Sequence, residues 1–81
     1  MFEEKPQVEQ EVFATEGEPP FGAVQSVEND YIVVYIENAG VVSIDARHVI
    51  KVHDGKVLVD ITGMPEAVRV KILHAHDAED G

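Results

Sequence analysis

Short runs of β-branched residues, separated by turn-forming glycine, proline, asparagine and aspartate at intervals of about 8–12 residues, dominate this chain. Branched side chains favour an extended backbone, and glycine or proline ends a β-ladder. The longest apolar run is Tyr31–Ile36, which would be apolar on both faces of a strand. The pattern predicts a mainly β protein, a small antiparallel β-barrel of about six short strands with a C-terminal helix.

Turn chemistry sets the expected boundaries. We expect strands over residues 8–15, 21–27, 31–36, 41–44, 49–53 and 56–61. Asp54 and Gly55 are typical of a type I′ hairpin, because this turn needs positive φ at both central residues. Gly22 indicates a bulge or a close backbone approach, and Asp45 is placed to cap a short helical turn over residues 45–48. The whole chain, 1–81, is expected to be one domain with frayed ends at 1–7 and 77–81.

The last segment fits two descriptions. Its apolar residues alternate with Arg69 and Lys71, as in a strand. A helix capped by Thr62 would instead gather one apolar stripe, made of Met64, Val68, Ile72 and Ala75. We favour a helix over residues 65–76.

Charge limits the partners that such a chain can have. Sixteen acids oppose six bases, for a formal net charge of −10. A surface of this sign repels phosphate backbones and anionic lipids, so nucleic acid and membrane partners are not expected, whereas a basic protein is. The chain has no cysteine, no apolar run of the ~20 residues that span a bilayer, and no signal-peptide pattern at its start. The expected location is the cytoplasm.

Four stretches carry a resemblance to a known family. They are residues 14–18 (ATEGE) with 21–27 (FGAVQSV), then 31–36 (YIVVYI), 42–49 (VSIDARHV) and 52–57 (VHDGKV). Over residues 12–61 the chain resembles the PRC-barrel-like domains, including a group of small bacterial domains. In that family the corresponding stretches form an opening hairpin, a glycine-kinked strand, a corner and a closing hairpin.

The resemblance implies a binding module and not an enzyme. Members of the family act as adaptors, in the ribosome maturation factor and in the cytoplasmic part of the photosynthetic reaction-centre H subunit. No catalytic residue carries over from the family to this chain. A shared fold supports such a function only by analogy.

The residues themselves suggest little catalytic chemistry. Asp45, Asp54 and Asp60 are explained as a cap, a turn and a solvent-facing residue, and no nucleophile or phosphate-binding motif is present. We expect no enzymatic activity and no cofactor. His74 and His76 are the candidates for a metal site, because residues two apart share a face on a strand but point apart on a helix. His48 and His53 bracket a strand and are expected at its rim.

The run Tyr31–Ile36 has two interpretations. Either one face fills the barrel while the C-terminal helix covers the other, or Tyr31, Val33 and Tyr35 face outward as an interface. The C-terminal segment, with Val68, Val70 and Ile72, is a second candidate interface.

Three functional classes follow from these observations. The leading hypothesis is a noncatalytic protein–protein interaction module that forms a homodimer through an apolar strip with an acidic rim. A histidine-based sensor of a metal or small ligand is the first alternative. The second is an RNA-associated small barrel, which the net charge disfavours.

Overall fold

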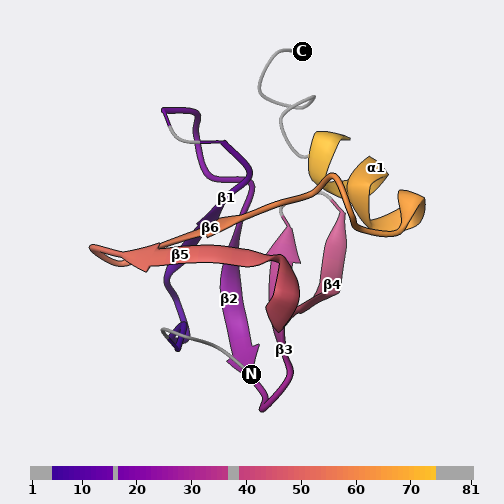
Figure 1. The fold of residues 1–81 in the computed structure, drawn as a ribbon. Helices are drawn as coiled ribbons and strands as arrows, with labels where there is room; N and C mark the ends of the chain where they lie inside the picture. The colour runs from indigo at the N-terminus through magenta and orange to yellow at the C-terminus, as the bar shows by residue number, and fades with distance from the viewer. Residues whose placement is uncertain (1–4, 16, 37–38, 75–81) are drawn as a thin grey trace.

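The computed structural model describes residues 5–15, 17–36 and 39–74, with only the backbone of His74. These residues form six strands, one 3₁₀ turn and one helix, and Figure 1 shows how the strands and the helix are arranged. The elements are β1 (Glu11–Phe13), β2 (Gly22–Val27), β3 (Tyr31–Ile36), β4 (Gly40–Asp45), η1 (Ala46–His48), β5 (Val49–His53), β6 (Lys56–Val59) and α1 (Glu66–His74). The prediction of a mainly β chain with a C-terminal helix is confirmed.

All six strands belong to one sheet, in the order β4-β3-β2-β1-β6-β5. Four of its five ladders are antiparallel, whereas β1 and β6 run parallel. The expectation of a wholly antiparallel sheet is therefore wrong at one ladder. Hairpins impose antiparallel pairing only on strands that follow each other in the chain, and β1 and β6 are distant in sequence.

The sheet is open but must be strongly bent. Its two edge strands, β4 and β5, do not pair with each other within the described ranges, yet only η1 separates them along the chain. From Asp45 to Val49 the backbone reaches at most ~14 Å, while five inter-strand spacings in a flat sheet would cover ~24 Å. The edges must therefore approach each other. Figure 1 accordingly shows β5 and β6 running across the direction of β2 and β3.

Local turn chemistry explains the boundaries of several elements. Asp54 and Gly55 have φ values of 52° and 76°, as the predicted hairpin between β5 and β6 requires. The carboxylate of Asp45 accepts a hydrogen bond from the backbone N–H of Arg47 at 3.0 Å, so the predicted cap of η1 is confirmed. Gly22 lies in a close approach of β2 to β3, and the bulge in that ladder falls between Val24 and Ser26.

The core lies on the inner face of the bent sheet. Alternate residues of β3, β4 and β6 are buried, and Met64 from the turn before α1 and Ile72 from α1 join the same cluster. The buried apolar residues are Val12, Phe21, Val24, Ile32, Val34, Ile36, Val42, Ile44, Val57, Val59, Met64 and Ile72. The period-two pattern of the strands and the helical stripe of the last segment therefore meet in a single cluster.

The first strand and the N-terminal segment differ from the predictions. β1 covers only Glu11–Phe13, because Glu9 adopts a positive φ of 76° and leaves Val8 exposed. Pro6 is fully buried, so the expected fraying of residues 1–7 does not hold there. Residues 1–4 and 77–81 lie outside the described residues.

The helix differs from the prediction at its start. It begins at Glu66, and the hydroxyl of Thr62 donates to Asp60 instead of capping the helix. The strand alternative for this segment is wrong. Ala75, the last member of the predicted helical stripe, lies outside the described residues.

Candidate functional site

One candidate surface is the outward face of β3 and β4, which we call the tyrosine face and define by Tyr31, Val33, Tyr35 and Val41. Tyr31 is 41% exposed, and Tyr35 and Val41 are both 50% exposed. Tyr35 lies directly opposite Val41 in the antiparallel ladder, and Tyr31 lies opposite Asp45. The face is thus a short apolar strip that ends beside a carboxylate.

This exposure decides between the two interpretations of β3. Ile32, Val34 and Ile36 are fully buried, while the alternate residues point away from the core. The expectation that α1 covers the outer side of β3 is wrong, because the helix contributes its apolar stripe to the inner cluster. The outward placement of Tyr31, Val33 and Tyr35 is observed instead.

The second predicted interface, on the C-terminal segment, is divided by the helical periodicity. Ile72 is buried in the core and Val68 packs against it. Ile72 is therefore inaccessible, and Val68 is half-buried. Val70 points to the other side of the helix and is exposed. Only Val70 is fully available for contact with a partner.

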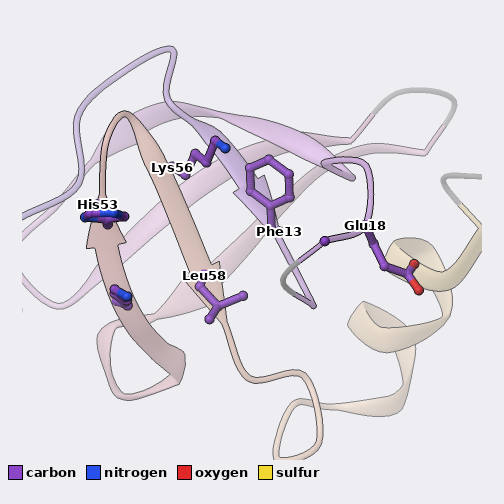
Figure 2. Close-up of a pocket in the computed structure, with 7 residues that line it drawn as sticks. Phe13, Glu18, His53, Lys56 and Leu58 are labelled. Atoms are coloured by element: carbon purple, nitrogen blue, oxygen red, sulfur yellow. The ribbon is translucent and has the colours of Figure 1, made fainter.

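A second candidate surface lies on the outer face of β1, β5 and β6. In the strand order, β2 lies between these strands and the two strands of the tyrosine face, β3 and β4. Here a pocket of about 430 Å³ opens to solvent (Figure 2). We call it the basic pocket, and it is lined by Phe13, Gly17, Glu18, Lys51, His53, Lys56 and Leu58.

Strand register explains why these side chains meet. Phe13 pairs with Leu58 across the parallel ladder, and Leu58 pairs with Lys51 across the antiparallel one. Two residue pairs further along, on the same face, His53 lies opposite Lys56. Directly opposed residues share a face of the sheet. The apolar side chains of Phe13 and Leu58 therefore lie beside two lysines and a histidine.

The polar groups of the basic pocket have few internal partners. The ammonium of Lys56 lies 5.7 Å from the centroid of the Phe13 ring, within the range of a cation–π interaction. His53 Nε2 lies 2.9 Å from the carboxylate of Asp54. The loop after β1 supplies Gly17 and Glu18, and Figure 2 shows Glu18 on the opposite side of Phe13 from His53.

The basic pocket does not follow from the sequence alone. The hairpin at Asp54 and Gly55 predicts part of it, because this hairpin puts Lys51 and His53 on the same face of the sheet as Lys56 and Leu58. The missing element was Phe13, which reaches this face only through the parallel pairing of β1 with β6.

The histidines do not assemble into a metal site in the part of the chain that the structure describes, where no cluster of three metal-ligating residues occurs. His48 is buried under Gly63, so the expected position at a strand rim is wrong for it. His53 is exposed, as expected. His74 lies on the helix, the side chain of His74 is not described, and His76 lies outside the described residues.

The three aspartates that could have suggested acid–base chemistry have structural roles. Asp45 caps η1 and Asp54 forms the hairpin turn. Asp60 accepts hydrogen bonds from the hydroxyl of Thr62 at 2.6 Å and from its backbone N–H at 2.9 Å. The hydroxyl bond first, and then the backbone bond, lower the pKa of Asp60 below its ordinary value of 3.8.

The lowered pKa of Asp60 makes a testable prediction. Replacement of Thr62 by valine removes the hydroxyl donor, so the pKa of Asp60 should rise toward 3.8. In the wild type this carboxylate stabilises the fold above pH 3.8, and the contribution is lost as pH falls through the lower folded-state pKa. Carboxyl chemical shifts followed through an acid titration measure the change. Thr15→Val, at another exposed threonine, should leave the titration of Asp60 unaltered.

Comparisons of the chain with protein-family models, with curated proteins and with solved structures find no match. None of the helices among the described residues is long and apolar enough to cross a membrane.

Proposed function

We propose that this chain is a noncatalytic, PRC-barrel-like protein–protein interaction module that pairs with a second copy of itself through the tyrosine face. The observation that carries the proposal is the exposure of Tyr31, Tyr35 and Val41 on one face of the regular β3–β4 ladder, where Tyr35 lies directly opposite Val41. Tyrosine suits such a surface because its ring gives a large apolar contact while its hydroxyl tolerates water.

The barrel description rests on the path of the chain. The two edge strands are joined through η1 alone, which forces the sheet to curl around its core. Two backbone hydrogen bonds bring both ends of the sheet to this turn. The N–H of Asp60 donates to the carbonyl of His48 at 2.7 Å and continues the β5–β6 ladder, and the N–H of Ala46 donates to the carbonyl of Asp30 at 2.8 Å and continues the β3–β4 ladder. The resemblance over residues 12–61 supports the family named in the proposal.

Self-pairing fits the energetics of a chain this small. A domain of about 80 residues buries only ~60–65% of its unfolded surface, so covering an apolar strip adds stability that the monomer lacks. The net charge of −10 opposes the pairing of two copies. Added salt screens this repulsion and should therefore strengthen the dimer.

Sedimentation velocity at micromolar concentrations tests the proposal. We expect the wild type to dimerise, more tightly at high salt than at low salt. Tyr35→Lys should weaken dimerisation by a factor of about 30 or more, because it puts a hydrated charge at the centre of the contact. Ile50→Lys is the matched control, since Ile50 is also an exposed apolar strand residue but lies on β5.

Two results would contradict the proposal. One is a wild type that stays monomeric at every accessible concentration and salt. The other is a dimer that Tyr35→Lys and Ile50→Lys weaken equally, which would place the contact away from the tyrosine face.

A further inference from the structure

The floor of the basic pocket is apolar and half-buried. Phe13 and Leu58 lie directly opposite each other in the parallel ladder between β1 and β6. Both side chains belong to the outer face of the sheet, so neither contributes to the core cluster. An aromatic and an aliphatic side chain at the base of a concave site offer a surface on which the apolar body of a ligand can be desolvated.

The rim of the basic pocket is cationic in a chain that is otherwise acidic. Lys51 and Lys56 are two of the six lysines and arginines of the whole sequence. Neither takes part in an ion pair among the described residues, although Glu11 lies opposite Lys56 on the same face of the β1–β6 ladder. The cation–π contact with Phe13 keeps the ammonium of Lys56 beside the apolar floor. An ammonium held beside an apolar surface and free of a carboxylate partner favours an anionic ligand.

The surrounding charge restricts the size of that ligand. At physiological salt a charge is screened over ~8 Å. Inside the pocket Lys51 and Lys56 attract an anionic group and Glu18 and the neighbouring Glu11 oppose it, while the acidic excess of the chain acts on anything that extends further. A polyanion such as a nucleic acid would extend into the repulsive region. Glu18 lines the far side of the pocket from His53, which leaves one cationic end to receive one anionic group (Figure 2).

We propose that the basic pocket binds a small organic monocarboxylate with an aromatic or branched aliphatic body. The carboxylate would lie between the ammonium groups of Lys51 and Lys56, and the apolar body would rest on Phe13 and Leu58. The volume of about 430 Å³ is at the lower end of the range for small-molecule sites. The basic pocket and the tyrosine face share no residue, so this inference is independent of dimerisation.

A matched pair of probes tests the proposal on the full chain. 1-Naphthylacetate and 1-naphthylacetamide have nearly the same shape, and only the first is charged at neutral pH. Titrations followed by amide chemical shifts should give a dissociation constant at least about 10-fold lower for the carboxylate than for the amide. The largest shifts should fall on residues of β1, β5 and β6.

Variants of the rim distinguish binding of the carboxylate in the basic pocket from its nonspecific attraction to any lysine. The double substitution Lys51→Gln with Lys56→Gln should weaken carboxylate binding about 10-fold, to the level of the amide. Both side chains are exposed, so the fold should be retained. Lys71→Gln, on the outside of α1, should leave the affinity unchanged. Equal binding of the two probes, no binding of either one, or an equal loss with Lys71→Gln would overturn the proposal.

Discussion

The variant Gly22→Ala is expected to lose at least about 3 kcal/mol of unfolding free energy. A methyl group at this position would overlap the backbone carbonyl oxygen of Tyr35 and would lie 3.0 Å from Cγ1 of Val34. Backbone atoms of a central strand cannot move aside as a flexible side chain can, so β2 would have to separate from β3. An ordinary domain of this length has ~4–12 kcal/mol of stability, and the loss is a large part of it.

Gly40→Ala separates this steric effect from the general cost of replacing a glycine. Gly40 has a positive φ of 86°, but a methyl group there would meet no heavy atom within 4 Å. The cost should be about 1 kcal/mol, which is the strain of a left-handed conformation for alanine. Urea denaturation followed by circular dichroism measures both variants. Equal losses, or a larger loss at Gly40, would mean that β2 and β3 do not approach each other as closely as the structure shows.

The elements that the sequence predicts best are those whose causes are local. The bounds of β3 and β5, the cap at Asp45 and the hairpin at Asp54 and Gly55 all agree with the structure. Each depends on residues within a few positions of one another, such as a carboxylate two residues before the N–H that it binds. Alternation alone also identifies Ile32, Val34 and Ile36 as one face of a strand.

The features that the sequence does not predict depend on distant partners. Tyr31–Ile36 is apolar on both sides, so its composition does not determine which side is buried. That depends on where α1 and the neighbouring strands pack. The parallel ladder between β1 and β6 follows from no local pattern. The basic pocket needs that ladder to bring Phe13 to Leu58. It therefore cannot be predicted from local sequence patterns either.

A pair of isoleucines gives the second large effect. Ile32→Ala should cost about 2–5 kcal/mol, because Ile32 has no exposed surface and its truncation leaves a cavity in the core. Ile50→Ala removes the same atoms from a side chain that is 59% exposed, and it should change stability by less than about 0.5 kcal/mol. Denaturant midpoints, with the slope held common to all variants, give both values.

The comparison also tests which face of β3 is inside. A shift of one residue in the ladders of β3 would exchange the inward and outward sets, so that Tyr31 and Val33 would be buried in place of Ile32. Val33→Ala would then cost more than Val34→Ala, whereas the present register predicts the opposite order, because Val34 has no exposed surface and Val33 is half-buried. Ile32→Val, with an expected loss of about 0.5–1.5 kcal/mol, gives a measurable value if Ile32→Ala does not fold. A larger loss at Val33 than at Val34 would remove the inward face of β3 from the core, and with it the outward tyrosines on which self-pairing depends.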